Sequence, residues 1–221
     1  MKSFSFFHVT LLLCLFFISS VYAIRMDLGV GLGLGYSGLI TSDSKSNDLE
    51  DYNGGSASQF SVYGIYFFKE NMAWYFSYGI YSTDYTGLAD KIKSYKEEAS
   101  FHFEYRTLSF LFRYYPTSFF YLEIGPQFKS YEEPPSYIYY AHESGDPLIR
   151  EEVAIKNNYS DVVSLAHGVG LRIKRIEISL TSMIDITPSA KANSFKSDYS
   201  NASVRFYNFN LNFSFYFLRL T

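Results

Sequence analysis

Cysteine is almost absent from this sequence of 221 residues, since Cys14 is the only one. A single cysteine cannot form an intrachain disulfide or supply a multi-thiolate metal site. Charged residues are also few, at 19% of the chain, and the net charge is −3. This balance gives no indication of the basic stripe that nucleic-acid binding requires. We therefore expect no nucleic acid among the partners.

Long apolar runs are missing as well. After the N-terminal segment, no stretch approaches the roughly 20 apolar residues that a membrane helix needs. Aromatic residues nevertheless make up 20% of the chain, with 22 Tyr and 22 Phe. This combination is typical of a membrane β-barrel, because each spanning strand gives half of its positions to a polar face.

The N-terminus has the features of a cleaved signal peptide. Lys2 supplies a positive start, and an apolar run extends from Val9 to Ile18. Val21-Tyr22-Ala23 places small residues three and one before the expected cut. We predict a signal peptide at residues 1–23, which would remove the single cysteine, and one domain at residues 24–221. An uncleaved anchor helix is the alternative.

The clearest structural signal is the alternation of apolar and polar residues near the C-terminus. One face carries Phe209, Leu211, Phe213, Phe215 and Phe217, and the other carries Asn208, Asn210, Asn212 and Ser214. A period of two indicates a β-strand with two unlike faces. About ten residues is the length of a strand that crosses a bilayer at a tilt.

The same pattern recurs along the chain. Strands are expected at residues 24–36, 59–69, 72–82, 100–114, 119–131, 159–174, 176–186 and 208–217. The connections between them alternate between long and short. Bacterial outer-membrane barrels have an even number of strands, short periplasmic turns and long outer loops. We therefore predict an all-β fold, an eight-stranded antiparallel up-and-down transmembrane β-barrel.

One of these segments is irregular. In residues 100–114, Phe103 and Tyr105 are out of phase with Leu108 and Phe112. Two explanations are open: a bulge near Arg106, or a strand top that projects beyond the bilayer and no longer needs to keep the phase.

Alternation alone does not say which face looks outward, since a lipocalin places its apolar face inside, around a ligand. Here the polar face carries small residues and charges of both signs. Such residues suit an eight-stranded interior, which is only just wide enough for side chains to fill it. We predict a lumen polar network and no open channel. Its residues are Asp27, Arg113, Glu123, Lys129, Arg172, Glu177 and Asp185.

Three stretches carry a family resemblance. They are residues 110–116 (Phe-Leu-Phe-Arg-Tyr-Tyr-Pro) followed by residues 121–126 (Tyr-Leu-Glu-Ile-Gly-Pro), residues 168–171 (Gly-Val-Gly-Leu) before a two-residue turn, and the aromatic final strand. On these, the chain resembles small outer-membrane β-barrels of the PorT-like and OmpX-like type. The resemblance implies an outer-membrane location and a barrel fold, but no uniform activity. The chain departs from the pattern at its end, where Phe217 is followed by four non-aromatic residues.

Candidate chemistry is sparse. His102 and Glu104 share a face near the outer end of their strand and could serve a lipid-modifying enzyme, although a solvated strand top is the simpler explanation. His167 falls on the lipid-facing phase, which predicts a place near an interface or in a local bulge. No His, Asp or Glu pair has convincing metal spacing. We expect no metal and no cofactor.

The sequence therefore favours a monomeric outer-membrane barrel that is not an enzyme and has a structural or surface-interaction role. Its surroundings would be outer-membrane lipid and lipopolysaccharide. The longest expected loop, residues 132–158, contains Tyr137, Tyr139 and Tyr140, where we expect an extracellular or envelope protein to bind. The alternatives are an outer-membrane barrel enzyme acting on lipid A acyl chains and a secreted lipocalin-like carrier.

Overall fold

The computed structural model describes nine segments of the chain. They are residues 25–41, 52–53, 55–88, 96–131, 136–142, 149–154, 161–188, 190–191 and 203–220. The predicted signal peptide lies outside the described residues. Within these segments no helix has the length and apolar character to span a membrane.

Eight long strands form the body of the described structure. They are β1 (Arg25–Thr41), β3 (Gly55–Lys69), β4 (Met72–Leu88), β5 (Lys96–Tyr114), β6 (Phe120–Tyr131), β9 (Val162–Ile173), β10 (Ile176–Asp185) and β12 (Ser203–Leu220). Four shorter strands add to the sheet at one end: β2 (Tyr52–Asn53), β7 (Ser136–His142), β8 (Ile149–Ala154) and β11 (Ala190–Lys191).

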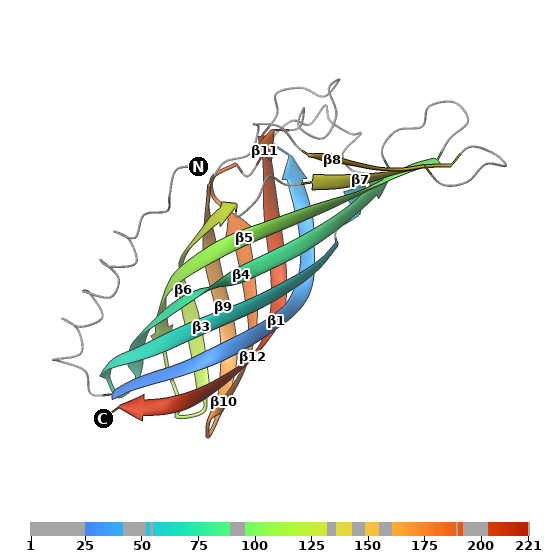
Figure 1. The fold of residues 1–221 in the computed structure, drawn as a ribbon. Helices are drawn as coiled ribbons and strands as arrows, with labels where there is room; N and C mark the ends of the chain where they lie inside the picture. The colour runs from blue at the N-terminus through green and yellow to red at the C-terminus, as the bar shows by residue number, and fades with distance from the viewer. Residues whose placement is uncertain are drawn as a thin grey trace.

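The eight strands close into a barrel. Each pairs antiparallel with its neighbours in the order β1, β3, β4, β5, β6, β9, β10 and β12, and β12 pairs with β1. Figure 1 shows the strands tilted around one axis, with the short turns at the lower end. Closure gives each of the eight strands a partner on both sides, which is how a sheet satisfies its backbone groups in lipid. The predicted eight-stranded antiparallel up-and-down barrel is confirmed.

Large apolar side chains point outward all around the barrel. Examples are Leu32 and Leu34 on β1, Val62 on β3, Tyr78 and Ile80 on β4, Phe110 on β5, Ile124 on β6, Leu165 on β9, Leu180 on β10 and Phe213 on β12. On β10, Leu180 is 43% exposed while the adjacent Ser179 is 7% exposed and faces the lumen. This arrangement is the opposite of a lipocalin-like carrier, whose apolar face surrounds a ligand.

The irregular phase in β5 has an explanation that the sequence analysis did not offer. The β4–β5 pairing runs from Met72 opposite Tyr114 to Leu88 opposite Glu98 without a register shift, so there is no bulge near Arg106. Phe103 and Tyr105 keep the lumen phase and are buried. Aromatic residues enter the interior here because the end of the lumen away from the short turns is packed with rings.

The prediction of a loop at residues 132–158 is wrong, because this stretch contains a β-hairpin. β7 pairs with β5 from Lys96 to His102, and β8 pairs with β7. The pairing of β5 with β6 ends at Tyr105 opposite Tyr131. The edge of β5 before Tyr105 is therefore available to pair with β7. Both β4 and β5 extend beyond their expected ends, because continued strand pairing satisfies backbone groups that a loop would leave to water.

Small residues in the lumen make room for tyrosine rings. Gly170 on β9 lies beside Tyr121 of β6, and a Cβ added to Gly170 would meet the Tyr121 ring. Gly29 stands in the same relation to Tyr63. The glycines therefore follow from the packing of large side chains in a narrow interior, where added volume is poorly tolerated.

We expect Gly170→Ala to destabilise the barrel by about 1–3 kcal/mol, because its methyl group would displace the Tyr121 ring. The measurement is urea unfolding of the folded protein in detergent, followed by loss of the fast-migrating band on unboiled gels. Val169→Leu is the matched control, since Val169 is the adjacent outward residue and its extra methylene meets no lumen group. Equal unfolding midpoints for Gly170→Ala and wild type would contradict close packing at Tyr121.

Candidate functional site: the lumen polar network

The structure places all seven predicted lumen residues on the inner face, where each is buried. It does not gather them into one site. Five of them, Asp27, Arg113, Glu123, Arg172 and Glu177, form a network near the short turns. Lys129 and Asp185 form a second centre, an ion pair of their own.

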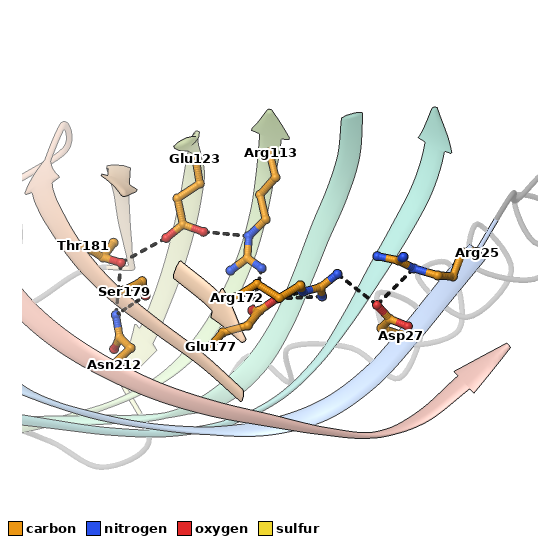
Figure 2. A network of polar contacts seen from close by, with 9 residues as sticks. All are labelled: Arg25, Asp27, Arg113, Glu123, Arg172, Glu177, Ser179, Thr181 and Asn212. Atoms are coloured by element: carbon orange, nitrogen blue, oxygen red, sulfur yellow. Dashed lines mark hydrogen bonds and ion pairs between the residues drawn. The ribbon is translucent and has the colours of Figure 1, made fainter. Parts of the chain in front are cut away.

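Arg113 and Arg172 are the two hubs of the first network. Arg113 Nε lies 2.8 Å from Glu123 Oε2, and its Nη1 lies 2.9 Å from Glu177 Oε2. Arg172 Nη2 lies 2.6 Å from Glu177 Oε1, and its Nη1 lies 3.1 Å from Asp27 Oδ2. Figure 2 shows the chain of contacts crossing the lumen between strands. Each carboxylate therefore has a cationic partner, which buried charges require.

Two arginines that the sequence analysis left out of the network belong to it. Arg25 Nε lies 3.3 Å from Asp27 Oδ2, and Arg219 Nε lies 3.0 Å from Asp27 Oδ1. The spacing from Asp27 could have identified Arg25, because both stand on the same face of β1. Arg219 could not be identified that way, since simple alternation from Phe217 turns it outward.

A β-bulge brings Arg219 inward. Leu28 pairs with Leu218 and Gly29 pairs with Tyr216, so Phe217 is an extra residue on β12. An extra residue shifts the alternation of the strand by one position. Arg219 therefore reaches into the lumen toward Asp27 at the rim of the barrel.

Aromatic rings surround the arginines. The Arg113 guanidinium carbon lies 3.9 Å from the ring centre of Tyr75 and 4.3 Å from that of Tyr121. Arg172 lies 4.9 Å from the ring centre of Tyr216. These cation–π contacts add stabilisation that strengthens where water is excluded. Burial raises the pKa of Tyr115, in the turn after β5, so this phenol stays neutral.

The second centre is a buried ion pair with extra donors. Lys129 Nζ lies 2.8 Å from Asp185 Oδ1, and both side chains are 1% exposed. The Ser164 hydroxyl donates to Asp185 Oδ1 at 2.6 Å, and the backbone N–H of Phe206 donates to Oδ2 at 3.1 Å. Asp185 is thus satisfied by three donors.

Aromatic rings close the lumen beyond this pair. The Phe103 ring centre lies 5.1 Å from that of Phe206, and the Tyr105 ring centre lies 4.7 Å from that of Tyr131. Between the two charged centres is a cavity of about 40 Å³, lined by residues such as Ser77, Gln127 and Asn212. This volume holds a few water molecules. The described lumen is therefore a packed core and offers no room for a substrate.

The remaining candidate residues are scattered. His167 is exposed on the outer face of β9 beside Ile124 and Ser182, and the continuous register there excludes the local bulge that we considered. Glu104 is half-buried on β5. The His102 backbone pairs with residues 84 and 136, while its side chain lies outside the described part. No group of three or more His, Cys, Asp or Glu residues in the described segments is placed to hold a metal ion.

The three tyrosines that we expected in a loop lie on a strand. Tyr137, Tyr139 and Tyr140 belong to β7 and pair with residues 101, 99 and 98 of β5. Their side chains lie outside the described part of the structure. The backbone nevertheless places them on the hairpin that pairs with the projecting part of β5 (Figure 1).

Neither the protein-family models nor the curated proteins include a match to this sequence. Solved structures that match include Neisserial surface protein A, with a TM-score of 0.43, 9% identity, and coverage of 87% of this chain and 99% of that one. The attachment invasion locus protein Ail of Yersinia pestis matches with a TM-score of 0.41, 9% identity, and coverage of 88% and 98%. The outer membrane protein OprG of Pseudomonas aeruginosa matches with a TM-score of 0.41, 11% identity, and coverage of 89% and 97%. At these scores the matches carry no argument about activity or partners, and the barrel rests on its own strand pairing.

We expect Lys129→Met to destabilise the barrel by about 3–5 kcal/mol, because it leaves the Asp185 carboxylate buried without its cation. The double variant Lys129→Met/Asp185→Asn should recover most of this loss, since no unpaired charge remains. Chemical unfolding of the folded protein in detergent measures both. If the double variant is as unstable as the single one, the ion pair does not determine the effect.

Proposed function

We propose that this chain is an outer-membrane β-barrel with a structural or surface-interaction role, and that it is not an enzyme. One observation carries the proposal: apolar side chains point outward on all eight barrel strands while paired charges fill the lumen. Soluble monomers rarely expose apolar patches of more than about a few hundred Å². A band around a whole barrel fits contact with lipid instead.

An aromatic cluster on the outer face supports the same location. Trp74 stacks on Phe110 with ring centres 4.8 Å apart, and Phe68 and Phe112 lie beside them at the lower parts of β3, β4 and β5. Aromatic residues at this level are typical of the girdle at a membrane–water interface. The short turns would then face the periplasm and the longer connections would face outward.

The projecting hairpin is our candidate for the binding element. β5 continues beyond the barrel between β4 and β7, and β8 adds the outermost strand (Figure 1). Within the described residues, β8 pairs on one side only. An exposed strand edge offers backbone donors and acceptors to a strand of another protein. The partner would be an extracellular or envelope protein, reached through residues 136–154.

The rest of the proposal follows from the membrane location. The signal peptide at residues 1–23 would direct export, and the mature domain at residues 24–221 would insert as a monomer surrounded by outer-membrane lipid and lipopolysaccharide. The PorT-like and OmpX-like resemblance belongs to the proposal too. We propose no cofactor, metal or nucleic acid.

The lipid-modifying alternative lacks a supporting observation. Such an enzyme needs a histidine, a nucleophile and a carboxylate together near the outer rim. Glu104 lies on β5, whereas His167 lies on a different strand, β9, and the two do not form such a group. The lumen carboxylates are all held by cations and face no substrate-sized cavity.

An epitope tag inserted between His142 and Ile149 should be labelled by antibody on intact cells, because the β7–β8 hairpin lies at the end opposite the short turns. The same tag inserted between Lys174 and Arg175 should be labelled only after the outer membrane is permeabilised. Heat-modifiable migration on gels confirms that each tagged protein remains a folded barrel. The reverse labelling pattern, or recovery of both proteins in the soluble fraction, would contradict the proposal.

A further inference from the structure

A basic vestibule opens at the short-turn end of the barrel. This cavity of about 460 Å³ has nine lining residues, which are Arg25, Ser118, Arg172, Lys174, Arg175, Tyr216, Phe217, Leu218 and Arg219. Five of the nine are cationic and none of them is a carboxylate. The whole chain has a net charge of −3, so this mouth departs in sign from the protein as a whole.

The positive charge of the vestibule is not neutralised by the ion pairs beside it. Arg25, Arg172 and Arg219 all contact one carboxylate, that of Asp27. Lys174 and Arg175 form no ion pair with any residue that the structure describes. The vestibule and the adjoining network together hold six basic side chains, with Arg113, against three acidic ones, Asp27, Glu123 and Glu177. Within this set, basic side chains therefore exceed acidic ones by three.

The turn that carries Lys174 and Arg175 has an unusual backbone. Lys174 has a φ of 54°, and it is the only non-glycine residue with positive φ in the described structure. Gly, Asn and Asp take this conformation at less cost than lysine, and they dominate two-residue hairpin turns. A lysine held in a disfavoured conformation is a reason to look for a role of its side chain.

The same turn is fixed in place against the last strand. The backbone N–H of Tyr216 donates to the carbonyl of Arg175 at 3.0 Å. This contact ties the turn to β12, beside the bulge at Phe217. Backbone contacts therefore hold the cationic turn and Arg219 at the wall of the same cavity.

We propose that the vestibule binds the phosphate of an anionic phospholipid headgroup. Lys174, Arg175 and Arg219 supply cationic donors, which form the stronger class of hydrogen bond to phosphate oxygens. Phe217 and Leu218 form an apolar part of the wall and are 55% and 41% exposed. A free phosphate makes no favourable contact with this apolar wall. The acyl chains of a lipid can pack against it and continue along the outside of β12.

The inference rests on the orientation proposed above, in which the short turns face the periplasm. There the vestibule meets the inner leaflet of the outer membrane, at the level of its headgroups. Arg172 contributes charge rather than a direct contact, because its guanidinium nitrogens already face Asp27 and Glu177. The exposed cations of the rim are the groups that a headgroup can reach.

The test uses the full-length mature barrel in nanodiscs of phosphatidylcholine that contain a small fraction of phosphatidylglycerol. Native mass spectrometry then counts the phosphatidylglycerol molecules that each barrel retains. We expect Lys174→Asn to weaken phosphatidylglycerol retention about fivefold, since one basic contact to an anionic surface is removed. The same variant should unfold no more easily than wild type, because asparagine tolerates positive φ.

Lys69→Asn is the matched control, because Lys69 is exposed beside a different short turn and does not line the vestibule. It should retain phosphatidylglycerol as wild type does. Equal retention by wild type and Lys174→Asn would overturn the proposal, as would displacement of the lipid by inorganic phosphate at matched concentration. If wild type fails to form a heat-modifiable barrel in the nanodisc, the proposed membrane function itself fails and this site fails with it.

Discussion

The register between β1 and β12 is the constraint on which the rest of the structure depends. These strands come from opposite ends of the described chain, and their pairing from Met26 opposite Leu220 to Thr41 opposite Val204 closes the sheet. Because side chains alternate, a slip of one residue would turn every inward residue outward. A basic residue turned toward lipid near the bilayer midplane costs about 2–4 kcal/mol. The lumen charges and the outward phenylalanines therefore specify the same register.

Closure at eight strands leaves an interior too narrow for an open aqueous channel, so most lumen positions are small, paired or aromatic. The chain separates these solutions along the barrel axis. Arginines and carboxylates occupy the end near the short turns, and Phe103, Tyr105 and Phe206 close the other end. In our account the barrel is a packed support, and its working parts lie at its two ends: the projecting hairpin on one side and the basic vestibule on the other.

Much of this architecture follows from the sequence because period two survives through most strands. The inward place of Glu177 and Asp185 could be read from their neighbours, since Leu180 and Ile184 take the opposite phase. Phe103 and Tyr105 could not be placed, because aromatic residues suit lipid and a ring-filled lumen equally. No sequence pattern indicates the bulge at Phe217, so the contact between Arg219 and Asp27 was not predicted. The hairpin in residues 132–158 was missed because that stretch is polar, contains Pro134-Pro135 and shows no clear alternation.

The most direct test of the account is a cysteine scan of residues 176–185 on β10, one position at a time, with Cys14 the only native cysteine in the chain. Each cysteine carries a nitroxide label, and its collisions with oxygen, which concentrates in lipid, are measured in bilayers. The account predicts high oxygen collision rates at outward positions such as Leu180 and low rates at inward positions such as Ser179, with a period of two. The opposite phase, or collision rates typical of water at every outward position, would contradict a lipid-facing apolar surface.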